Sequence, residues 1–136
     1  MTITLHVGSD LFEHDLDPYV TMWAAIIYYL DDLEDKFCVK KLAGCDPYGE
    51  VVFNLEYCKL LSKEIPNLFR LFKERKLPDP SCISRFSQRF NSNSWWDCYG
   101  DLDILTWEEI EKFLIDLRLI ITKAVKENRP IIAVGD

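Results

Sequence analysis

One long amphipathic segment near the C-terminus most constrains how this chain can fold. Its apolar residues recur at steps of three and four, which is the period of a helix with one buried face. They are Trp107, Ile110, Phe113, Leu114, Leu117, Ile120, Ile121, Ala124 and Val125. Thr106 and Glu109 have the spacing of a capping box, which marks a helix start, and Pro130 ends the pattern. The sequence therefore predicts a helix within Leu105 to Arg129 whose apolar face is the centre of the core.

The two ends of the chain have the character of strands. Ile3, Leu5 and Val7 alternate with polar residues, which predicts a half-buried strand over residues 2–7. Residues 131–134 form a β-prone run too short to stand alone, so we expect it to pair with the first strand. The sequence therefore predicts a small sheet that contains the two terminal strands.

The first half of the chain contains a second expected helix. Asp17 and Pro18 have the residue types of an N-cap and a first helical position, and apolar residues continue to about Glu34. Residues 37–42 and 51–53 flank a turn-rich stretch, so a hairpin over residues 37–53 is compatible with the pattern. These features predict a helix over residues 18–34 followed by a short β segment.

A further helical region follows Asn54. This residue can cap a helix over residues 55–65, and Pro66 either kinks that helix or begins another that runs to about Arg75. Ser81 can cap a short helix beyond the next turn. We therefore predict an α+β fold, mainly helical, with one domain over residues 1–136 and a small sheet from the terminal strands and the hairpin.

Composition limits the class of protein. Apolar residues make up 49% of the 136 residues, which argues against disorder, and no apolar run is long enough for a membrane span. The five cysteines are odd in number and include no C-x-x-C pair, so free thiols in a reducing cytoplasm explain them better than disulfides do. We expect a cytoplasmic protein that does not contact membranes.

The net charge of −7 is distributed unevenly along the chain. Residues 1–35 contain eight acids and no lysine or arginine, residues 36–93 carry a net charge of +5, and residues 94–136 carry −4. This asymmetry disfavours a nucleic-acid binder, although arginines and phenylalanines do alternate between Phe69 and Phe90. An acidic surface that attracts a basic protein fits the distribution, and solubility alone explains it as well.

One stretch combines aromatic and acidic residues just before the long helix. It holds Trp95, Trp96, Asp97, Tyr99, Asp101 and Asp103. Aromatic anchors beside acids suit a protein-binding surface, whereas the alternative is that the tryptophans dock the segment onto the core. The three aspartates lack the glycine and the terminal glutamate of a calcium-binding EF-hand loop. We interpret the stretch as the leading candidate for partner binding.

A second acidic candidate surrounds His14. Glu13, Asp15 and Asp17 lie close to it in sequence, but the tight histidine or cysteine pairs of a zinc site are missing. A cysteine nucleophile paired with His6 or His14 has no local motif in its favour. The sequence thus points to a second acidic surface and indicates no metal, cofactor or catalytic residue.

In size, charge and single-domain makeup the chain resembles the immunity proteins of bacterial toxin systems. The resemblance rests on no motif and carries over no residue. It implies a noncatalytic module that neutralises a basic toxin or nuclease domain by direct binding. The alternative hypothesis is a small enzyme or ligand-binding protein with a pocket between helices, and the sequence leaves the partner and the oligomeric state open.

Overall fold

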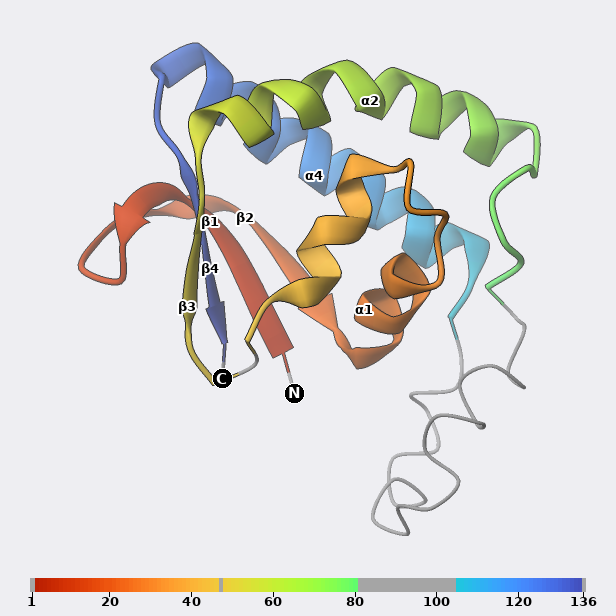
Figure 1. The fold of residues 1–136 in the computed structure, drawn as a ribbon, viewed down its shortest axis with the longest axis horizontal. Helices are drawn as coiled ribbons and strands as arrows, with labels where there is room; N and C mark the ends of the chain where they lie inside the picture. The colour runs from red at the N-terminus through yellow and green to blue at the C-terminus, as the bar shows by residue number, and fades with distance from the viewer. Residues whose placement is uncertain (1, 47, 81–104, 136) are drawn as a thin grey trace, which may run out of the picture.

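The fold is built on an antiparallel sheet whose strands come from both ends of the chain (Figure 1). The computed structural model describes residues 2–46, 48–80 and 105–135. Its sheet has four strands in the order β2-β1-β4-β3, and every neighbouring pair is antiparallel. The elements are β1 (Thr2–Asp10), β2 (Glu13–Trp23), α1 (Ala24–Asp31), the 3₁₀ helix η1 (Cys38–Gly44), β3 (Glu50–Phe53), α2 (Leu55–Lys73), α4 (Trp107–Glu127) and β4 (Ile131–Gly135).

The terminal strands pair as the sequence predicts. Leu5 of β1 lies opposite Ala133 of β4, and the first strand continues past the expected residue 7 to Asp10. Ile3, Leu5 and Val7 are buried on the helix-covered face, while Thr4 and His6 point the other way. Alternation along β1 therefore sets which face of the sheet belongs to the core, and the α+β class is confirmed.

The helix predicted over residues 18–34 is wrong in its first part. Residues up to Trp23 form β2, and only Ala24–Asp31 is helical. Val20 and Met22 lie opposite Leu5 and Ile3 and are buried with them, which satisfies a period of two rather than 3.6. Pro18 is tolerated because β2 is an edge strand, which has no neighbour on one side.

The strand at 37–42 and the hairpin over 37–53 are also wrong. Cys38–Gly44 is a 3₁₀ helix, and β3 pairs with β4 instead of with residues 37–42. The Glu64 carboxylate of α2 accepts hydrogen bonds from the N–H groups of Cys38 (2.8 Å) and Val39 (2.9 Å). A side chain from another helix thus caps the start of η1, which a local pattern does not reveal.

Helix α2 is one continuous helix. The Asn54 side chain accepts a hydrogen bond from the Tyr57 N–H at 2.9 Å, as expected of the cap, and the helix runs through Pro66. Pro66 leaves the carbonyl of Ser62 without its helical donor, and both residues lie on the exposed face, where water can replace that bond. Residues 55–73 therefore do not form two separate helices, which was the alternative that the sequence left open.

Helix α4 follows the predicted pattern closely. Thr106 Oγ1 accepts from the Glu109 N–H at 3.2 Å, while the Glu109 carboxylate bonds to the Thr106 hydroxyl instead of to its N–H. At the other end Asn128 adopts a left-handed conformation with φ of 54°, which asparagine tolerates well in a helix cap. Local signals thus fix both ends of this helix.

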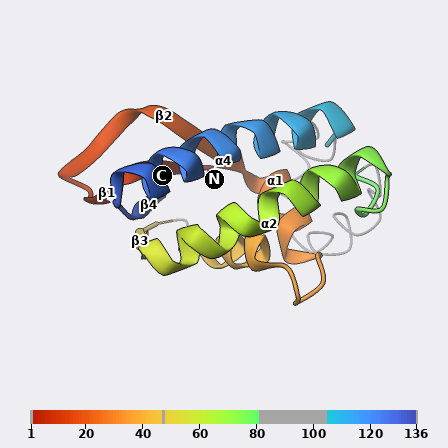
Figure 2. The same ribbon diagram turned by 90° about the horizontal axis from the view of Figure 1, so that it is seen from above.

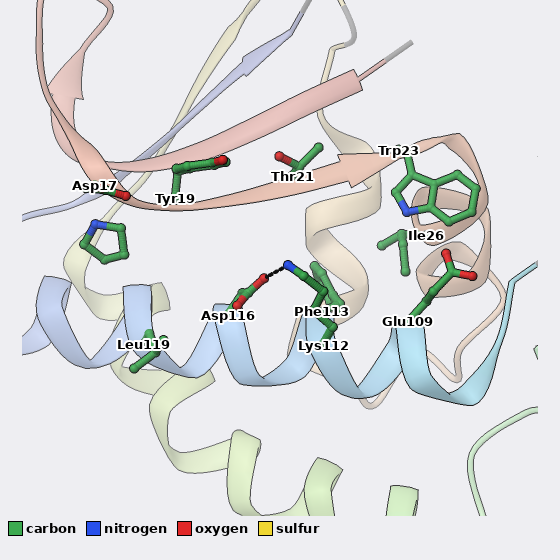
Figure 3. A pocket seen from close by; sticks show the side chains of 11 residues that line it. Asp17, Tyr19, Thr21, Trp23, Ile26, Glu109, Lys112, Phe113, Asp116 and Leu119 are labelled. Carbon is green, nitrogen blue, oxygen red and sulfur yellow. Dashed lines mark hydrogen bonds and ion pairs between the residues drawn. The ribbon is translucent and has the colours of Figure 1, made fainter.

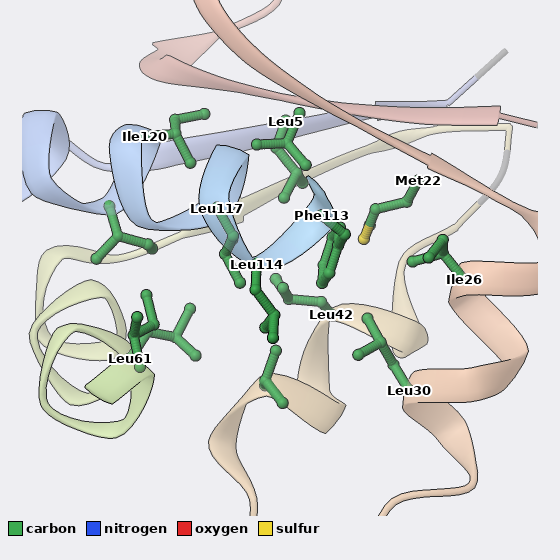
Figure 4. Close-up of a cluster of buried hydrophobic side chains, with 14 of the residues drawn as sticks. Leu5, Met22, Ile26, Leu30, Leu42, Leu61, Phe113, Leu114, Leu117 and Ile120 are labelled. Atoms are coloured by element: carbon green, nitrogen blue, oxygen red, sulfur yellow. The ribbon is translucent and has the colours of Figure 1, made fainter. Parts of the chain in front are cut away.

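The core lies between the sheet and the pair α2 and α4, which run side by side over it (Figure 2). Leu114 and Leu117 project from α4 into a cluster that includes Leu5 from β1 and Leu61 from α2 (Figure 4). Leu117 is fully buried, as predicted. Helix α4 packs mainly against α2 and β2, whereas the sequence predicted a helix over residues 18–34 as its partner. The described cysteines, Cys38, Cys45 and Cys58, are free thiols.

Candidate functional site

The structure describes only one of the two predicted partner-binding segments. The segment with Trp95, Trp96, Asp97, Tyr99, Asp101 and Asp103 lies outside the described residues, as does the short helix expected after Ser81. Glu13, Asp15 and Asp17 all lie on β2, on the hairpin that it forms with β1. Glu13 and Asp17 are exposed, whereas Asp15 is partly buried.

Asp15 ties the β1–β2 hairpin to the C-terminal end of α4. Its carboxylate forms ion pairs with Arg129, at 2.8 Å, and with Lys123. Lys123 also donates to the backbone carbonyl of Asp17 at 3.1 Å. Hydrogen bonds from Arg129 and Lys123 lower the pKa of Asp15 from 3.8 to about 2. Asp15 therefore positions the hairpin, and its charge is largely compensated within the chain.

Removing the Asp15 charge should weaken the acid dependence of folding. Because the folded-state pKa lies below the ordinary value, the stabilisation is present above about pH 4 and is lost as the pH falls toward about 2. We expect Asp15→Asn to show a flatter loss of stability over that interval, measured by urea unfolding at several pH values. The matched control is Glu13→Gln on the same strand; an Asp15→Asn curve with the wild-type slope would contradict the assignment.

The two histidine rings contact each other at a tilt of 46° on the face of the sheet opposite the helices. Their ring centroids are 4.6 Å apart, and the Tyr19 ring lies 6.2 Å from His6. His6 Nδ1 contacts the carbonyl of Asp15 at 3.0 Å, and His14 Nδ1 contacts that of Asp10 at 3.2 Å. Burial lowers the pKa of His6, and the charge of His14 adds to that effect. Burial thus favours the neutral form of the His6 ring at the base of the hairpin.

Glycine is required at position 8, opposite His14. A Cβ at Gly8 would overlap the Cα atom of His14 and the carbonyl of Glu13 on the adjacent strand. The register of β1 and β2 shifts on both sides of Gly8, so the strands approach closely at this irregular position. The residues around His14, which the sequence predicted only as an acidic surface, therefore belong to a hairpin with a defined shape.

Metal and thiol chemistry find little support among the residues that the structure describes. Within residues 2–46, 48–80 and 105–135, no group of three or more His, Cys, Asp or Glu side chains could hold a metal ion. Burial raises the pKa of the Cys45 thiol to about 11 and also raises the pKa of Cys38 and of Cys58. These three cysteines remain protonated near neutral pH, which disfavours a nucleophilic role.

The hairpin exposes several large apolar side chains that the sequence analysis did not single out. Phe12 at its tip is 95% exposed, Leu16 is 77% exposed and Tyr19 is 53% exposed. The tip is held in place because Asp10 Oδ1 accepts from the N–H groups of Phe12 (2.8 Å) and Glu13 (2.9 Å). In the sequence, the only sign of this surface is that these apolar residues lie between acids. Their exposure becomes evident only once the hairpin is seen.

A groove of about 500 Å³ runs between β2 and α4 (Figure 3). Ile26 and Phe113 give it an apolar floor, and the Lys112–Asp116 ion pair, at 2.7 Å, lies along its rim. The hydrogen bond that Lys112 donates to the Asp116 carboxylate raises the pKa of Lys112. The lining residues are Asp17, Pro18, Tyr19, Thr21, Trp23, Ile26, Glu109, Lys112, Phe113, Asp116 and Leu119.

Comparison of the chain with protein-family models, curated proteins and solved structures gives no match. The site must therefore be interpreted from its geometry. The charged groups described along the groove are three acids and one lysine, with no histidine or cysteine among these lining residues. No helix in the described part of the chain combines the length and apolar character needed to cross a bilayer. Exposed apolar side chains, acids and a groove thus meet along β2.

Proposed function

We propose that this protein is a small acidic binding module that inhibits a basic protein by direct contact, as immunity proteins do with toxin or nuclease domains. The observation that carries the proposal is the β1–β2 hairpin, which presents Phe12, Leu16 and Tyr19 to solvent. Exposed aromatic and aliphatic side chains supply contact area in protein interfaces. A tip fixed by Asp10 presents that area in one conformation, which lowers the entropic cost of binding.

The acidic residues at the hairpin and along the groove favour a basic partner. Glu13 and Asp17 flank the exposed apolar residues, and Asp17, Glu109 and Asp116 outnumber Lys112 along the groove. An acidic field accelerates encounter with a positively charged protein. The segment with Trp95, Trp96, Asp97, Tyr99, Asp101 and Asp103 has the same character in sequence and belongs to the same proposal. Free cysteines fit action in the cytoplasm.

The groove also supports a second candidate, a ligand-binding protein or small enzyme. Its volume lies within the range of about 300–1,000 Å³ that is typical of small-molecule sites. Its charged lining is a surface ion pair with two further acids, which suits a cationic ligand better than acid–base chemistry. Saturable binding of a small cation in the groove, with no protein partner of defined stoichiometry, would favour this candidate.

The first experiment is purification of the tagged chain from its native cells, followed by reconstitution with any stoichiometric basic partner. The proposal expects a defined complex in which the partner loses its activity. Reconstitution from two purified proteins distinguishes a specific complex from adventitious capture. A partner whose activity is unchanged in the complex would contradict inhibition, and the absence of any complex would contradict the binding role.

Neutralising the acids beside the hairpin should slow association. We expect Glu13→Gln combined with Asp17→Asn to lower the association rate and flatten its salt dependence, because two charges near the contact no longer attract the partner. Phe12→Ala should mainly raise the dissociation rate. Stopped-flow or surface-based kinetics at several salt concentrations measure both effects.

The matched control changes the same number of charges elsewhere. Glu56→Gln with Glu108→Gln removes two exposed acids from α2 and α4 and should leave the association rate close to wild type. Equal slowing by both pairs would mean that only net charge matters. In that case Asp97→Asn, Asp101→Asn and Asp103→Asn test the aromatic and acidic segment before α4 in the same assay.

A further inference from the structure

Strand β2 is the edge of the sheet next to the groove, and the register shows which of its backbone groups face outward. The Gly8 N–H donates to the Pro130 carbonyl at 3.0 Å, so this pair is a hydrogen-bonded one. Because such pairs alternate along an antiparallel ladder, the backbone groups of Thr4 and His6 also face β4. Those of Ile3 and Leu5 therefore face β2.

The same alternation continues across β2. Val20 and Met22 lie opposite Leu5 and Ile3, so their N–H and C=O groups bond to β1. The groups of Asp17, Tyr19, Thr21 and Trp23 point away from the sheet. Lys123 of α4 donates to the carbonyl of Asp17 at 3.1 Å, which confirms this direction at one end. Beyond that contact, Tyr19, Thr21 and Trp23 line the groove.

This edge lacks the features that usually block the addition of another strand. Natural edge strands are protected by charges, prolines or short length. In β2 these features gather at the hairpin end, at Asp15, Asp17 and Pro18, whereas residues 19–23 contain no charged residue and no proline. By contrast, the other edge strand, β3, has only four residues.

We propose that an extended, basic segment of the partner protein adds to β2 as a further antiparallel or parallel strand in this groove. The inference rests on the proposed function and specifies its binding mode. Backbone hydrogen bonds to Tyr19 and Thr21 and to the N–H of Trp23, whose carbonyl belongs to the N-cap of α1, hold the segment, as in other cases of β-strand addition. Alternate side chains of the segment face the apolar floor at Ile26 and Phe113.

Charge decides the chemistry of the segment. Three carboxylates border the groove, at Asp17, Glu109 and Asp116, and Lys112 is its one described cation. Lysine or arginine side chains on the added strand can pair with Asp17 and Glu109 while their aliphatic stems cover apolar surface. An acidic segment would meet like charges at the same positions, so a basic, alternating segment fits best.

A short synthetic peptide that alternates lysine with valine is the probe. Titrated into the ¹⁵N-labelled protein, it should shift and protect the amides of Tyr19, Thr21 and Trp23 above all others. N-methylation of the peptide residues that face β2 should weaken binding at least about tenfold, because two or three hydrogen bonds are lost. N-methylation of the alternate residues should leave binding unchanged, and replacing lysine by glutamate should abolish it.

Two proline variants test the same edge from the protein side. Thr21→Pro removes an outward N–H in the groove and should abolish peptide binding. Val52→Pro is the matched control, because Val52 lies on β3 at a position whose backbone also faces outward, on the opposite edge of the sheet. Circular dichroism and amide spectra establish whether each variant is folded. If a variant does not fold, the N-methylated peptides with the wild-type protein test the proposal.

The outcomes separate this inference from the proposed function. No amide shift at millimolar peptide, shifts away from β2, or equal effects of the two N-methylated peptides would overturn strand addition. Self-association of the chain that Thr21→Pro abolishes would assign the edge to a second copy and would also overturn it. If an inhibited partner binds Thr21→Pro and Val52→Pro equally well, strand addition at β2 is contradicted. The proposed inhibitory function is not affected by that result. Absence of any partner, by contrast, removes the function itself.

Discussion

Replacing Leu117 with alanine should lower the free energy of unfolding by about 2–5 kcal/mol. Leu117 is fully buried on α4, in the cluster that joins β1, α2 and α4 (Figure 4). Truncation removes apolar surface from the core and leaves a cavity that neighbouring side chains fill only in part. Urea unfolding followed by circular dichroism measures the change, with the slope of the transition expected to stay constant.

Leu119 provides the control on the same helix. It is 54% exposed and points toward the groove, so Leu119→Ala should change stability by less than about 1 kcal/mol. Similar losses for the two variants would mean that helix propensity, not burial, sets the cost. A loss well below 1 kcal/mol for Leu117→Ala would place the centre of the core elsewhere.

The sequence predicted α4 well because its signals are local. Thr106 and Glu109 cap the helix within one turn, and the apolar stripe from Ile110 to Ala124 has one period throughout. Burial follows that stripe residue by residue. The terminal strands were predictable for the same reason, since the alternation of Ile3, Leu5 and Val7 identifies both the strand and its buried face.

The β2–α1 boundary was not predictable from local pattern. Val20 and Met22 become strand residues because β1 offers hydrogen bonds and the buried neighbours Leu5 and Ile3, which lie on the preceding strand and outside the pattern of residues 18–34. Residues 17 and 18 have types that also begin helices, so the local pattern predicts a helix start there. Tertiary pairing overrode that preference and moved the helix start to Ala24.

The candidate site depends on this same boundary. The exposure of Phe12 and Leu16, and the groove beside Thr21, exist only because residues 13–23 form an edge strand next to α4. The sequence did identify the acids Glu13, Asp15 and Asp17, but it did not show that Asp15 pairs with Lys123 and Arg129.

The second large effect is expected at Glu64, whose carboxylate holds the start of η1. Glu64→Ala should lower the free energy of unfolding by about 2–4 kcal/mol, because the N–H groups of Cys38 and Val39 both lose a charged acceptor. Val39 is buried, so water reaches its N–H poorly after the change. Glu64→Gln keeps one acceptor and should cost about half as much. Urea unfolding of both variants measures the difference.

A local readout separates capping from a general loss of stability. Tyr57 donates to the Cys38 carbonyl at 2.6 Å, so α2 holds both sides of this residue, and Cys38 itself is only half-buried. Without the Glu64 carboxylate, η1 should open more often, and the Cys38 thiol should react faster with a disulfide reagent under native conditions. Amide exchange at Cys38 and Val39 should accelerate in parallel.

Lys63→Ala is the matched control, since Lys63 is exposed on the same turn of α2 and should leave both readouts unchanged. Faster reaction of Cys38 in Glu64→Ala but not in Lys63→Ala would tie the effect to the cap. If Glu64→Ala instead lost stability while Cys38 and Val39 kept their native protection, the carboxylate would act elsewhere. The capping bonds would then not be the reason that residues 38–44 form a 3₁₀ helix in place of the strand that their sequence suggests.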